Sequence, residues 1–419
     1  MILLLSVAFA ARPDAIGSAD SAHFRCHYET EAEQGRCDEV LGWAEEAYEA
    51  EVERIGFRPP PPDDGLGGSD AIDIYLTREA GGAGSAWVDC DGGDPDCIDP
   101  TPGDDRAEST SYVVIDPRTD DALFQSYVHH ELCHTYQYAT DYTEPFLSLW
   151  EGTAVACERW TDPTWPTLSD DFGDYQATPW LSTILQDGYF LADIGVNDDS
   201  WYEYGAVAWV WFIDETYGQG DGGTAPEVWE AASAPGATVL DAWEQLSGDY
   251  EASLLEFTAQ RARMGGPGAP AWSDFAGEAA RAAREAALSP GERREPAWPP
   301  YPLGISFFEV PAESEGLPLD FRGDEAVRWA LLSIDADTWS ELADGDPLAG
   351  GSTLAVVNLG PEGFAATDAL EPASFSVRAG GACGCASGGG GGVGLWGLVL
   401  CVVAQRRQSV GSIRRPKMS

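Results

Sequence analysis

The first third of the chain shows two kinds of hydrophobic pattern. Residues 23–28, 71–76 and 111–115 are short apolar or alternating runs bounded by turn-forming residues, and they predict strands. Residues 38–55 repeat their apolar positions every three or four residues, which is the period of an amphipathic helix. We therefore expect a small sheet with a helix packed on it.

The middle of the chain is predicted to be helical and its end to be strand-rich. Helical spacing of apolar residues is found over 126–160 and again over 204–264. Residues 162–200 between them are predicted to be loop-rich with a short helix near 180–186, and a more polar helix is predicted over 279–294. A proline-rich stretch follows at 296–302. After it the pattern changes to short alternating strands separated by turns, which predicts a small β-sandwich with strands at 305–310, 327–334, 353–358 and 374–377.

One segment of the helical region carries a metal-binding pattern. In the run from His130 to His134, H-E-L-C-H, the two histidines are one helical turn apart, so both lie on the same face and can bind one metal ion. Glu131 is offset from that face and can reach a water molecule on the metal. A catalytic zinc needs a third protein ligand and one open position. Glu151, on the next apolar helix, is the best candidate.

The segment around Glu151 adds a resemblance to this pattern. Residues 130–134 with a downstream Glu resemble the gluzincin group of zinc metallopeptidases, which includes the thermolysin-like enzymes. Aminopeptidases of this group carry a second segment, W-x-x-E-G-x-A-x-x-x-x-E. Residues 150–154, W-E-G-T-A, followed by Glu158 are similar, although the Trp directly precedes the Glu here.

The resemblance implies a role for each of these residues. His130, His134 and Glu151 would bind a single catalytic Zn²⁺, and Glu131 would be the general base. Glu158 would be a carboxylate that orients a ligand histidine. The G-x-M-E-N segment of the related aminopeptidases is absent from the chain, which favours an endopeptidase.

A further segment resembles the same group of enzymes. Residues 202–206 read Y-E-Y-G-A, similar to a Y-E-x-G-A segment whose tyrosine donates a hydrogen bond to the oxyanion. Carried over by position, that residue is Tyr202. The alternative interpretation is that Tyr202 and Tyr204 simply pack at the start of a helix.

The resemblance also implies a fold. Residues 20–265 would form a zincin-like catalytic domain, with a small mixed sheet before the metal-binding helix and a helical lower half. In that fold an edge strand beside the zinc pairs with extended peptide substrate, and residues 84–88 are the candidate. Residues 266–302 would be a helical and proline-rich linker, and 303–378 the β-sandwich domain.

Both ends of the chain look like targeting segments. Residues 1–10 are apolar and end in A-F-A, which matches a secretory signal peptide with its cleavage site. Residues 383–407 combine a Cys-Gly-Cys motif, an apolar segment and two arginines. They resemble the C-terminal sorting tails of myxobacterial surface proteins. We therefore expect an exported protein, at the cell surface or outside the cell, that contacts a membrane only through this transmembrane tail.

The charge of the chain limits its partners. It has 71 acidic residues against 23 Lys and Arg, a net charge of −48. This field repels nucleic acid and anionic membrane surfaces, so neither is expected as a partner. The sequence does not indicate an oligomeric state.

Cysteine spacing agrees with export. Cys133 and Cys157 lie on the two helices of the metal motif, where they either form a bridge or remain buried thiols. Four other cysteines flank short polar loops and predict two local disulfides of an oxidising compartment, Cys26 with Cys37 and Cys90 with Cys97.

The second of these loops is acidic. Asp89, Asp91, Asp94 and Asp96 are interleaved with glycine turns, and carboxylates in this arrangement could bind Ca²⁺. The frame of an EF-hand is missing, and in so acidic a chain a solvated loop is the favoured interpretation.

The sequence therefore predicts a secreted or surface-anchored zinc peptidase acting on a peptide or protein substrate. Two other interpretations stay open. One is an inactive zincin-fold protein for surface binding or adhesion, against which the intact Glu131 argues. The other is a purely structural zinc with a fourth ligand from His129 or Cys133. Helical geometry places His129 about 100° off the ligand face, which disfavours it.

Overall fold

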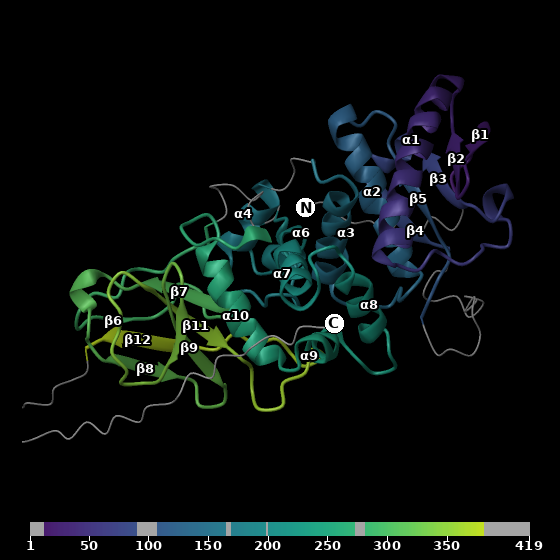
Figure 1. The fold of residues 1–419 in the computed structure, drawn as a ribbon. Helices are drawn as coiled ribbons and strands as arrows, with labels where there is room; N and C mark the ends of the chain where they lie inside the picture. The colour runs from purple at the N-terminus through teal and green to yellow at the C-terminus, as the bar shows by residue number, and fades with distance from the viewer. Residues whose placement is uncertain (1–11, 90–106, 165–168, 198–199, 273–280, 381–419) are drawn as a thin grey trace, which may run out of the picture. The chain divides into compact units, whose positions relative to one another are not determined.

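The computed structural model of the chain describes residues 12–89, 107–164, 169–197, 200–272 and 281–380 (Figure 1). These residues belong to one compact unit with helices and three sheets, so the predicted α+β class is confirmed. Four predictions fall outside the described residues, namely the signal peptide at 1–10, the Cys90–Cys97 pair, the aspartates 91, 94 and 96, and the tail at 383–407.

The N-terminal sheet has five strands. In spatial order they are β1 (Gly17–Asp20), β2 (Phe24–Tyr28), β3 (Ile72–Leu76), β5 (Ser111–Ile115) and β4 (Gly84–Val88). The pairs β2–β3 and β3–β5 are parallel, whereas β1 and β4 pair antiparallel with their neighbours. The sheet is thus mixed, and β4 forms one of its edges.

Helices cover one face of this sheet. α1 (Gln34–Ala47) continues into the π-helical η2 (Tyr48–Ile55), which confirms the helix predicted over 38–55. α2 (Asp121–Tyr138) contacts β4, β5 and α1, and on its other side it contacts α3 (Leu147–Thr161) (Figure 1). The sheet and these helices share one hydrophobic core, which fixes α2 against the edge strand.

The chain then continues through a helical region. Its helices are α4 (Ser169–Ala177), α5 (Gly188–Asp193), α6 (Tyr202–Gly205), α7 (Val207–Tyr217), α8 (Thr224–Ala232), α9 (Val239–Ser247) and α10 (Tyr250–Arg263). A Cβ atom on Gly152 of α3 would lie 2.9 Å from the backbone nitrogen of Val207, so only glycine allows α3 to approach α7 this closely. None of the helices in the described residues has the length and hydropathy of a membrane span.

The last part of the described chain forms two antiparallel sheets. One has the order β10 (Trp339–Leu342), β9 (Trp329–Ile334), β11 (Thr353–Asn358) and β7 (Ile305–Glu309). The other has the order β6 (Arg293–Arg294), β12 (Phe375–Ala379) and β8 (Leu319–Gly323). Side chains from both sheets, including Phe308, Leu354 and Phe375, form one hydrophobic cluster.

The four-stranded sheet is buried on both faces. Leu354 and Val356 of β11 belong to the cluster shared with the small sheet, whereas Ala355 and Val357 belong to the main core together with the helical region. Successive residues of a strand point to opposite faces, which produces this division. The main core therefore continues from the helical region into the C-terminal sheets.

The short helix predicted near 180–186 is wrong, because turns and irregular backbone occupy those residues between α4 and α5. The helix predicted over 279–294 is likewise wrong for the described residues of that range. Residues 281–294 are extended, apart from a turn, and contain β6. Glu285 and Leu288 donate backbone hydrogen bonds to the carbonyls of Phe307 and Glu309, at 2.7 and 3.0 Å, so this segment runs along β7. Backbone pairing and the burial of Leu288 outweigh a helical propensity that is weak in any case, and Pro290 would interrupt a helix.

Candidate metal centre

Three potential ligand side chains from two neighbouring helices meet at one point. His130 and His134 lie one turn apart on α2, and Glu151 lies on α3. The carboxylate oxygen Oε2 of Glu151 is 3.0 Å from Nε2 of His130 and 3.5 Å from Nε2 of His134. One ligand atom from each residue lies within 4.8 Å of the other two. The structure therefore brings together the three residues that the sequence predicted as ligands.

The other ring nitrogen of His130 is held by Glu158. Nδ1 of His130 lies 2.8 Å from Oε1 of Glu158. The hydroxyl of Ser126 donates a hydrogen bond to the second oxygen of that carboxylate. Glu158 thus lies where a carboxylate that orients a ligand histidine would be expected, and Nε2 of His130 is left facing Glu151.

His134 is oriented in the same way by a residue that the sequence analysis missed. Its Nδ1 lies 2.6 Å from Oε1 of Gln137, whose amide nitrogen donates to the carbonyl of Trp150 at 3.0 Å. Gln137 follows His134 by three positions and so shares its helix face. That spacing was the available signal, but a glutamine at this distance is too common on helices to stand out alone.

Burial and charge oppose each other in this group. Burial acts to lower the pKa of His130, but its hydrogen bonds with Glu151 and Glu158 outweigh it and hold that pKa well above its ordinary value. Burial acts to raise the pKa of Glu151, yet the neighbouring histidines His134 and His130 lower it below the ordinary carboxylate range. Glu151 is therefore ionised, as a carboxylate ligand must be.

Glu131 lies between the ligand group and the edge strand. It is nearly fully buried, and burial raises its pKa although the two histidines counteract the effect. The backbone N–H of Ala86 on β4 donates a hydrogen bond to its carboxylate. A Cβ atom on Gly84 would lie 2.7 Å from Cγ of Glu131, so the strand approaches this side chain closely only because residue 84 is glycine.

The register of β4 leaves part of its backbone free. Asp89 donates its N–H to the carbonyl of Thr110, and Ala83 accepts from the N–H of Asp116, both at 2.9 Å. Odd-numbered residues of β4 therefore bond to β5, and residues 84, 86 and 88 direct their backbone groups away from the sheet. The Ala86 carbonyl accepts a hydrogen bond from the hydroxyl of Tyr138. The edge strand predicted at 84–88 thus lies beside Glu131, and no other strand among the described residues pairs with its outer edge.

The prediction for Tyr202 needs correction. Its side chain is fully buried, and its hydroxyl donates a hydrogen bond to the carbonyl of Ser182 at 2.9 Å, away from the ligand group. The ring of Tyr204 instead stacks on that of His130 with centroids 5.8 Å apart. Burial, together with the nearby charge of Glu151, raises the pKa of the Tyr204 phenol well above its ordinary value. Because residues two apart on a helix point in nearly opposite directions, only one of the two tyrosines can face the centre.

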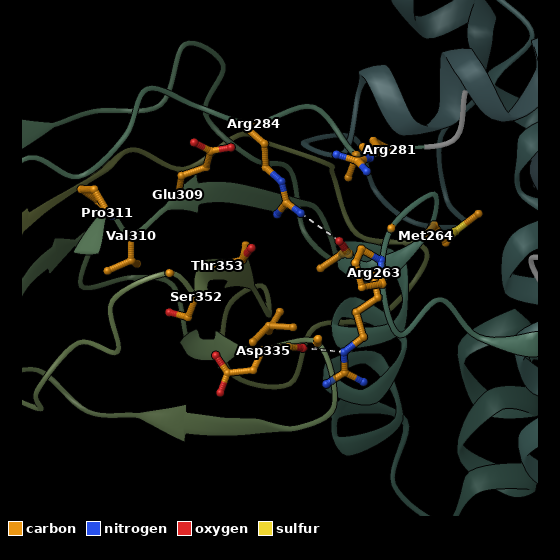
Figure 2. Close-up of a pocket in the computed structure, with 17 residues that line it drawn as sticks. Arg263, Met264, Arg281, Arg284, Glu309, Val310, Pro311, Asp335, Ser352 and Thr353 are labelled. Carbon is orange, nitrogen blue, oxygen red and sulfur yellow. Dashed lines mark hydrogen bonds between the residues drawn. The ribbon is translucent and has the colours of Figure 1, made fainter. Parts of the chain in front are cut away.

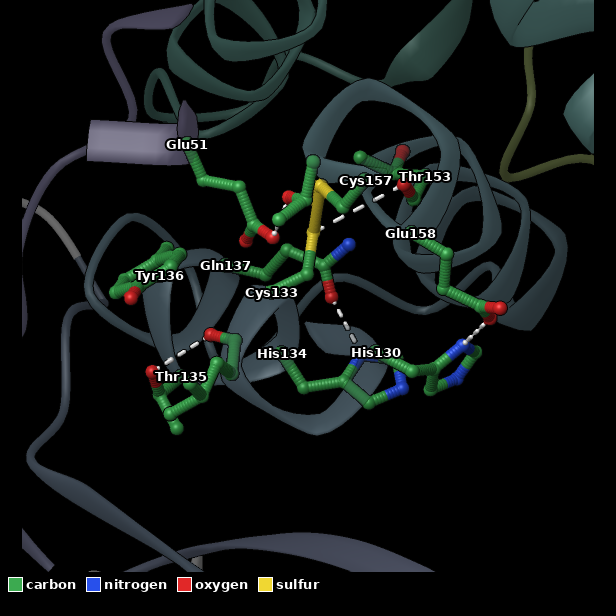
Figure 3. The surroundings of a disulfide bond; sticks show 12 residues. Glu51, His130, Cys133, His134, Thr135, Tyr136, Gln137, Thr153, Cys157 and Glu158 are labelled. Atoms are coloured by element: carbon green, nitrogen blue, oxygen red, sulfur yellow. Dashed lines mark hydrogen bonds and ion pairs between the residues drawn. A yellow bond between two sulfur atoms is a disulfide. The ribbon is translucent and has the colours of Figure 1, made fainter. Parts of the chain in front are cut away.

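A disulfide joins the two helices that carry the centre. Cys133 of α2 is bonded to Cys157 of α3, which settles the choice between a bridge and free thiols (Figure 3). The carboxylate of Glu51 lies beside the two sulfur atoms and accepts a hydrogen bond from Thr161 at 2.8 Å. Burial raises the pKa of Glu51 well above its ordinary value. The predicted Cys26–Cys37 disulfide is also formed.

Neither proposed fourth ligand joins the three residues of the centre. Cys133 is engaged in its disulfide. His129 is buried, burial lowers its pKa to about 4, and within the described residues it belongs to no group of potential ligands.

Asp89 is the one described residue of the predicted calcium loop. Both of its carboxylate oxygens accept hydrogen bonds from Arg12, at 2.9 and 2.7 Å.

Comparison with known proteins adds no relative. No family model, curated protein or solved structure gives a significant match to this chain.

Proposed function

We propose that the protein is a zinc-dependent peptidase of the gluzincin type that hydrolyses peptide bonds, most simply as an endopeptidase. The proposal rests on one observation, the convergence of His130, His134 and Glu151 on a single point beside Glu131. It includes a zincin-like arrangement of residues 20–265 and a β-sandwich formed by the C-terminal sheets. Export of the chain is proposed from the leader-like residues 1–10 and agrees with its disulfides.

The three side chains fit a zinc ion. Four ligands at about 2.0–2.1 Å in a tetrahedron are separated from one another by roughly 3.3 Å. The distances from Glu151 to the two imidazole nitrogens, 3.0 and 3.5 Å, lie on either side of that value. Three protein ligands leave the fourth position open, as catalytic zinc sites require. When bound, zinc would lower the pKa of a water molecule and polarise the scissile carbonyl.

Glu131 is the residue placed to move protons. Its carboxylate is adjacent to the ligand group but is not part of it. It would accept a proton from the attacking water and deliver it to the leaving amine. The hydrogen bond from Ala86 holds the carboxylate in one orientation, and its burial keeps bulk water from competing for the same proton.

Tyr204 and β4 supply the remaining functions. The phenol of Tyr204, which stacks on His130 and lies near the charge of Glu151, would donate a hydrogen bond to the oxyanion of the tetrahedral intermediate. The outward-facing backbone groups of Val88 and the N–H of Gly84 would pair with an extended substrate, as in strand addition. Recognition through backbone groups accepts many sequences, which fits a peptide or protein substrate.

The test combines metal content with activity. Wild type, Glu131→Gln and His134→Ala are purified, bound zinc is counted, and hydrolysis of a mixed peptide library is followed. We expect about one zinc in wild type and in Glu131→Gln, with turnover of the latter reduced by about 10²–10⁴-fold. His134→Ala should lose both zinc and activity. Glu46→Gln, on the exposed face of α1, serves as the matched control and should behave as wild type.

Two outcomes would reject the proposal. Zinc bound by a wild type that cleaves nothing would favour the alternative of an inactive surface binding or adhesion protein. Absence of zinc from the wild type after loading and dialysis would contradict the assignment of the ligands themselves.

A further inference from the structure

A second site lies away from the metal centre, where α10 ends against the C-terminal sheets. A cavity of about 530 Å³ opens there, within the range of small-molecule sites. Arg263, Arg281 and Arg284 lie on one side of it, and Glu309 and Val310 are on the other (Figure 2). No residue of the candidate metal centre lines this cavity.

Each of these guanidinium groups donates to a single backbone carbonyl, and that of Arg284 also lies over the ring of Phe307, 5.1 Å from its centroid. Arg263 donates to the carbonyl of Asp335, Arg281 to that of Gly265, and Arg284 to that of Ala262, all at 2.8 Å. A guanidinium has five N–H groups, so most donors of each arginine remain available. Among the described residues none of the three forms an ion pair with a carboxylate.

Two donors of this group are buried without a partner. Nη2 of Arg263 and Nη1 of Arg284 are shielded from solvent and have no hydrogen-bond partner in the described part of the chain. A buried donor without an acceptor costs free energy, and such groups in a folded protein call for a specific explanation. An acceptor supplied by a ligand is one such explanation.

The charge of the cavity is unusual for this protein. Only 23 of 419 residues are Lys or Arg, yet three of them line this cavity. Burial lowers the pKa of Arg284; the charge of Glu309 counteracts this in part, and the charge of Arg281 adds to it. Glu309 and Asp335 bring two negative charges to the lining against three positive ones. The balance favours an anion.

A purely structural role accounts for only part of this arrangement. The carbonyls of Ala262 and Gly265 lie at the end of α10, where cationic side chains favourably cap a helix. Capping explains one hydrogen bond for each of Arg281 and Arg284. It does not explain why Arg263, on the helix itself, lines the same cavity, nor why donors are left over.

We propose that this cavity binds a small organic anion, with its carboxylate or phosphate group on the three arginines. Guanidinium groups present paired N–H donors that match the two oxygens of either anion. Val310, Pro311 and Ile334 supply an apolar wall for the body of the ligand. The bound anion would join α10 to the 281–284 segment and to the four-stranded sheet. This site is additional to the proposed peptidase centre and does not depend on it.

Calorimetric titration at constant ionic strength tests the proposal. Full-length protein is titrated separately with inorganic phosphate and with hexanoate, which distinguishes a phosphate site from a carboxylate site. We expect at least one probe to bind saturably, with a dissociation constant of roughly millimolar or tighter. Arg281→Gln, a change at an exposed side chain, should weaken that binding by about tenfold without lowering the melting temperature appreciably.

Arg322→Gln is the matched control, because Arg322 is an exposed arginine on β8 outside the cavity. It should bind the probe as wild type does. The proposal is overturned if neither phosphate nor hexanoate shows saturable binding, even at concentrations well above the millimolar range. It is equally overturned if Arg281→Gln and Arg322→Gln bind with the affinity of wild type.

Discussion

Two tyrosines of α6 have opposite roles although they are only two residues apart. Tyr202 points into the core and bonds to the carbonyl of Ser182, whereas Tyr204 stacks on His130 near the charge of Glu151. The resemblance to a family segment predicted Tyr202 as the oxyanion donor. The direction of each side chain, which depends on where the helix begins and how it packs, favours Tyr204 for that role.

This difference gives a paired test. Tyr204→Phe should lower kcat of the proposed peptidase by about 10²-fold with zinc retained, because one hydrogen bond to the oxyanion is lost. Tyr202→Phe should leave kcat unchanged and cost about 1 kcal/mol of stability, because only the bond to Ser182 is lost. Turnover, zinc content and urea unfolding are measured on both. A larger loss of turnover in Tyr202→Phe would reverse the assignment.

A second residue-scale prediction concerns pH. Burial raises the pKa of Glu144 from its ordinary 4.5 to about 7. The folded state therefore holds a proton that the unfolded state releases between these values. Stability from the neutral carboxyl is fully present below pH 4.5 and is lost as pH rises through about 7.

Glu144→Gln removes this titration. The amide oxygen can still accept the hydrogen bond from the Phe146 N–H. Relative to wild type, the variant should gain on the order of 2 kcal/mol in unfolding free energy between pH 4.5 and pH 8. Urea unfolding at both pH values measures it, with the exposed Glu227→Gln as control. An equal difference from wild type at both pH values would count against a raised pKa.

How far the sequence predicts the site depends on how local each relation is. His130 and His134 are related by helix period alone, so their shared face could be predicted before any fold was known. The contact of Glu151 with them needs α2 and α3 to pack. The sequence offered Glu151 only as a candidate third ligand, which the resemblance then supported. Gln137 and Tyr204 carry no distinctive pattern, so tertiary structure was needed to identify them.

At the scale of elements, β4 and α2 are fitted to each other through glycine. A methyl group at position 84 would collide with Glu131, at 2.7 Å from its Cγ. The contacted atoms belong to the flexible side chain of Glu131, so this side chain would move and the strand would stay in place. Position 84 therefore controls the placement of the proposed general base.

Gly84→Ala should lower kcat by about 10-fold to 10²-fold, because a displacement of about 1 Å in a catalytic group has that effect. Zinc content should not change, since the ligands lie elsewhere. Gly42→Ala on α1 is the control, because a Cβ there meets no atom within 4 Å, and it should retain full activity. Unchanged turnover in Gly84→Ala would show that Glu131 is not held by the strand.

Helices and strands were predicted well where a local hydrophobic pattern determines them, and poorly where pairing with a distant segment determines the structure. The runs predicted as strands at 71–76 and 111–115 and the helix predicted over 38–55 formed as expected, because burial on one face reinforces each pattern. Residues 281–294 have few apolar positions to define a period. Pairing with β7 decided their structure, and such long-range pairing leaves no trace in a local pattern.

At the scale of the whole molecule, the net charge of −48 opposes the compact state through self-repulsion. Added salt shortens the range of that repulsion, from about 10 Å at 0.1 M to about 3 Å at 1 M. The melting temperature should therefore rise as NaCl increases over this range. A neutral solute at equal osmolality is the control. A flat or falling melting temperature in NaCl would contradict this account.

The core shared between the helical region and the C-terminal sheets has a consequence for synthesis. The segment that holds Tyr202 through Ser182 is itself bonded to residues far along the chain, since Pro179 accepts from Ile305 and Trp180 from Tyr301. A nascent chain therefore cannot complete the support of α6, or the placement of Tyr204, until the residues beyond 300 have left the ribosome. For the peptidase proposed above, this order of assembly would delay cleavage until the chain has been made past residue 300.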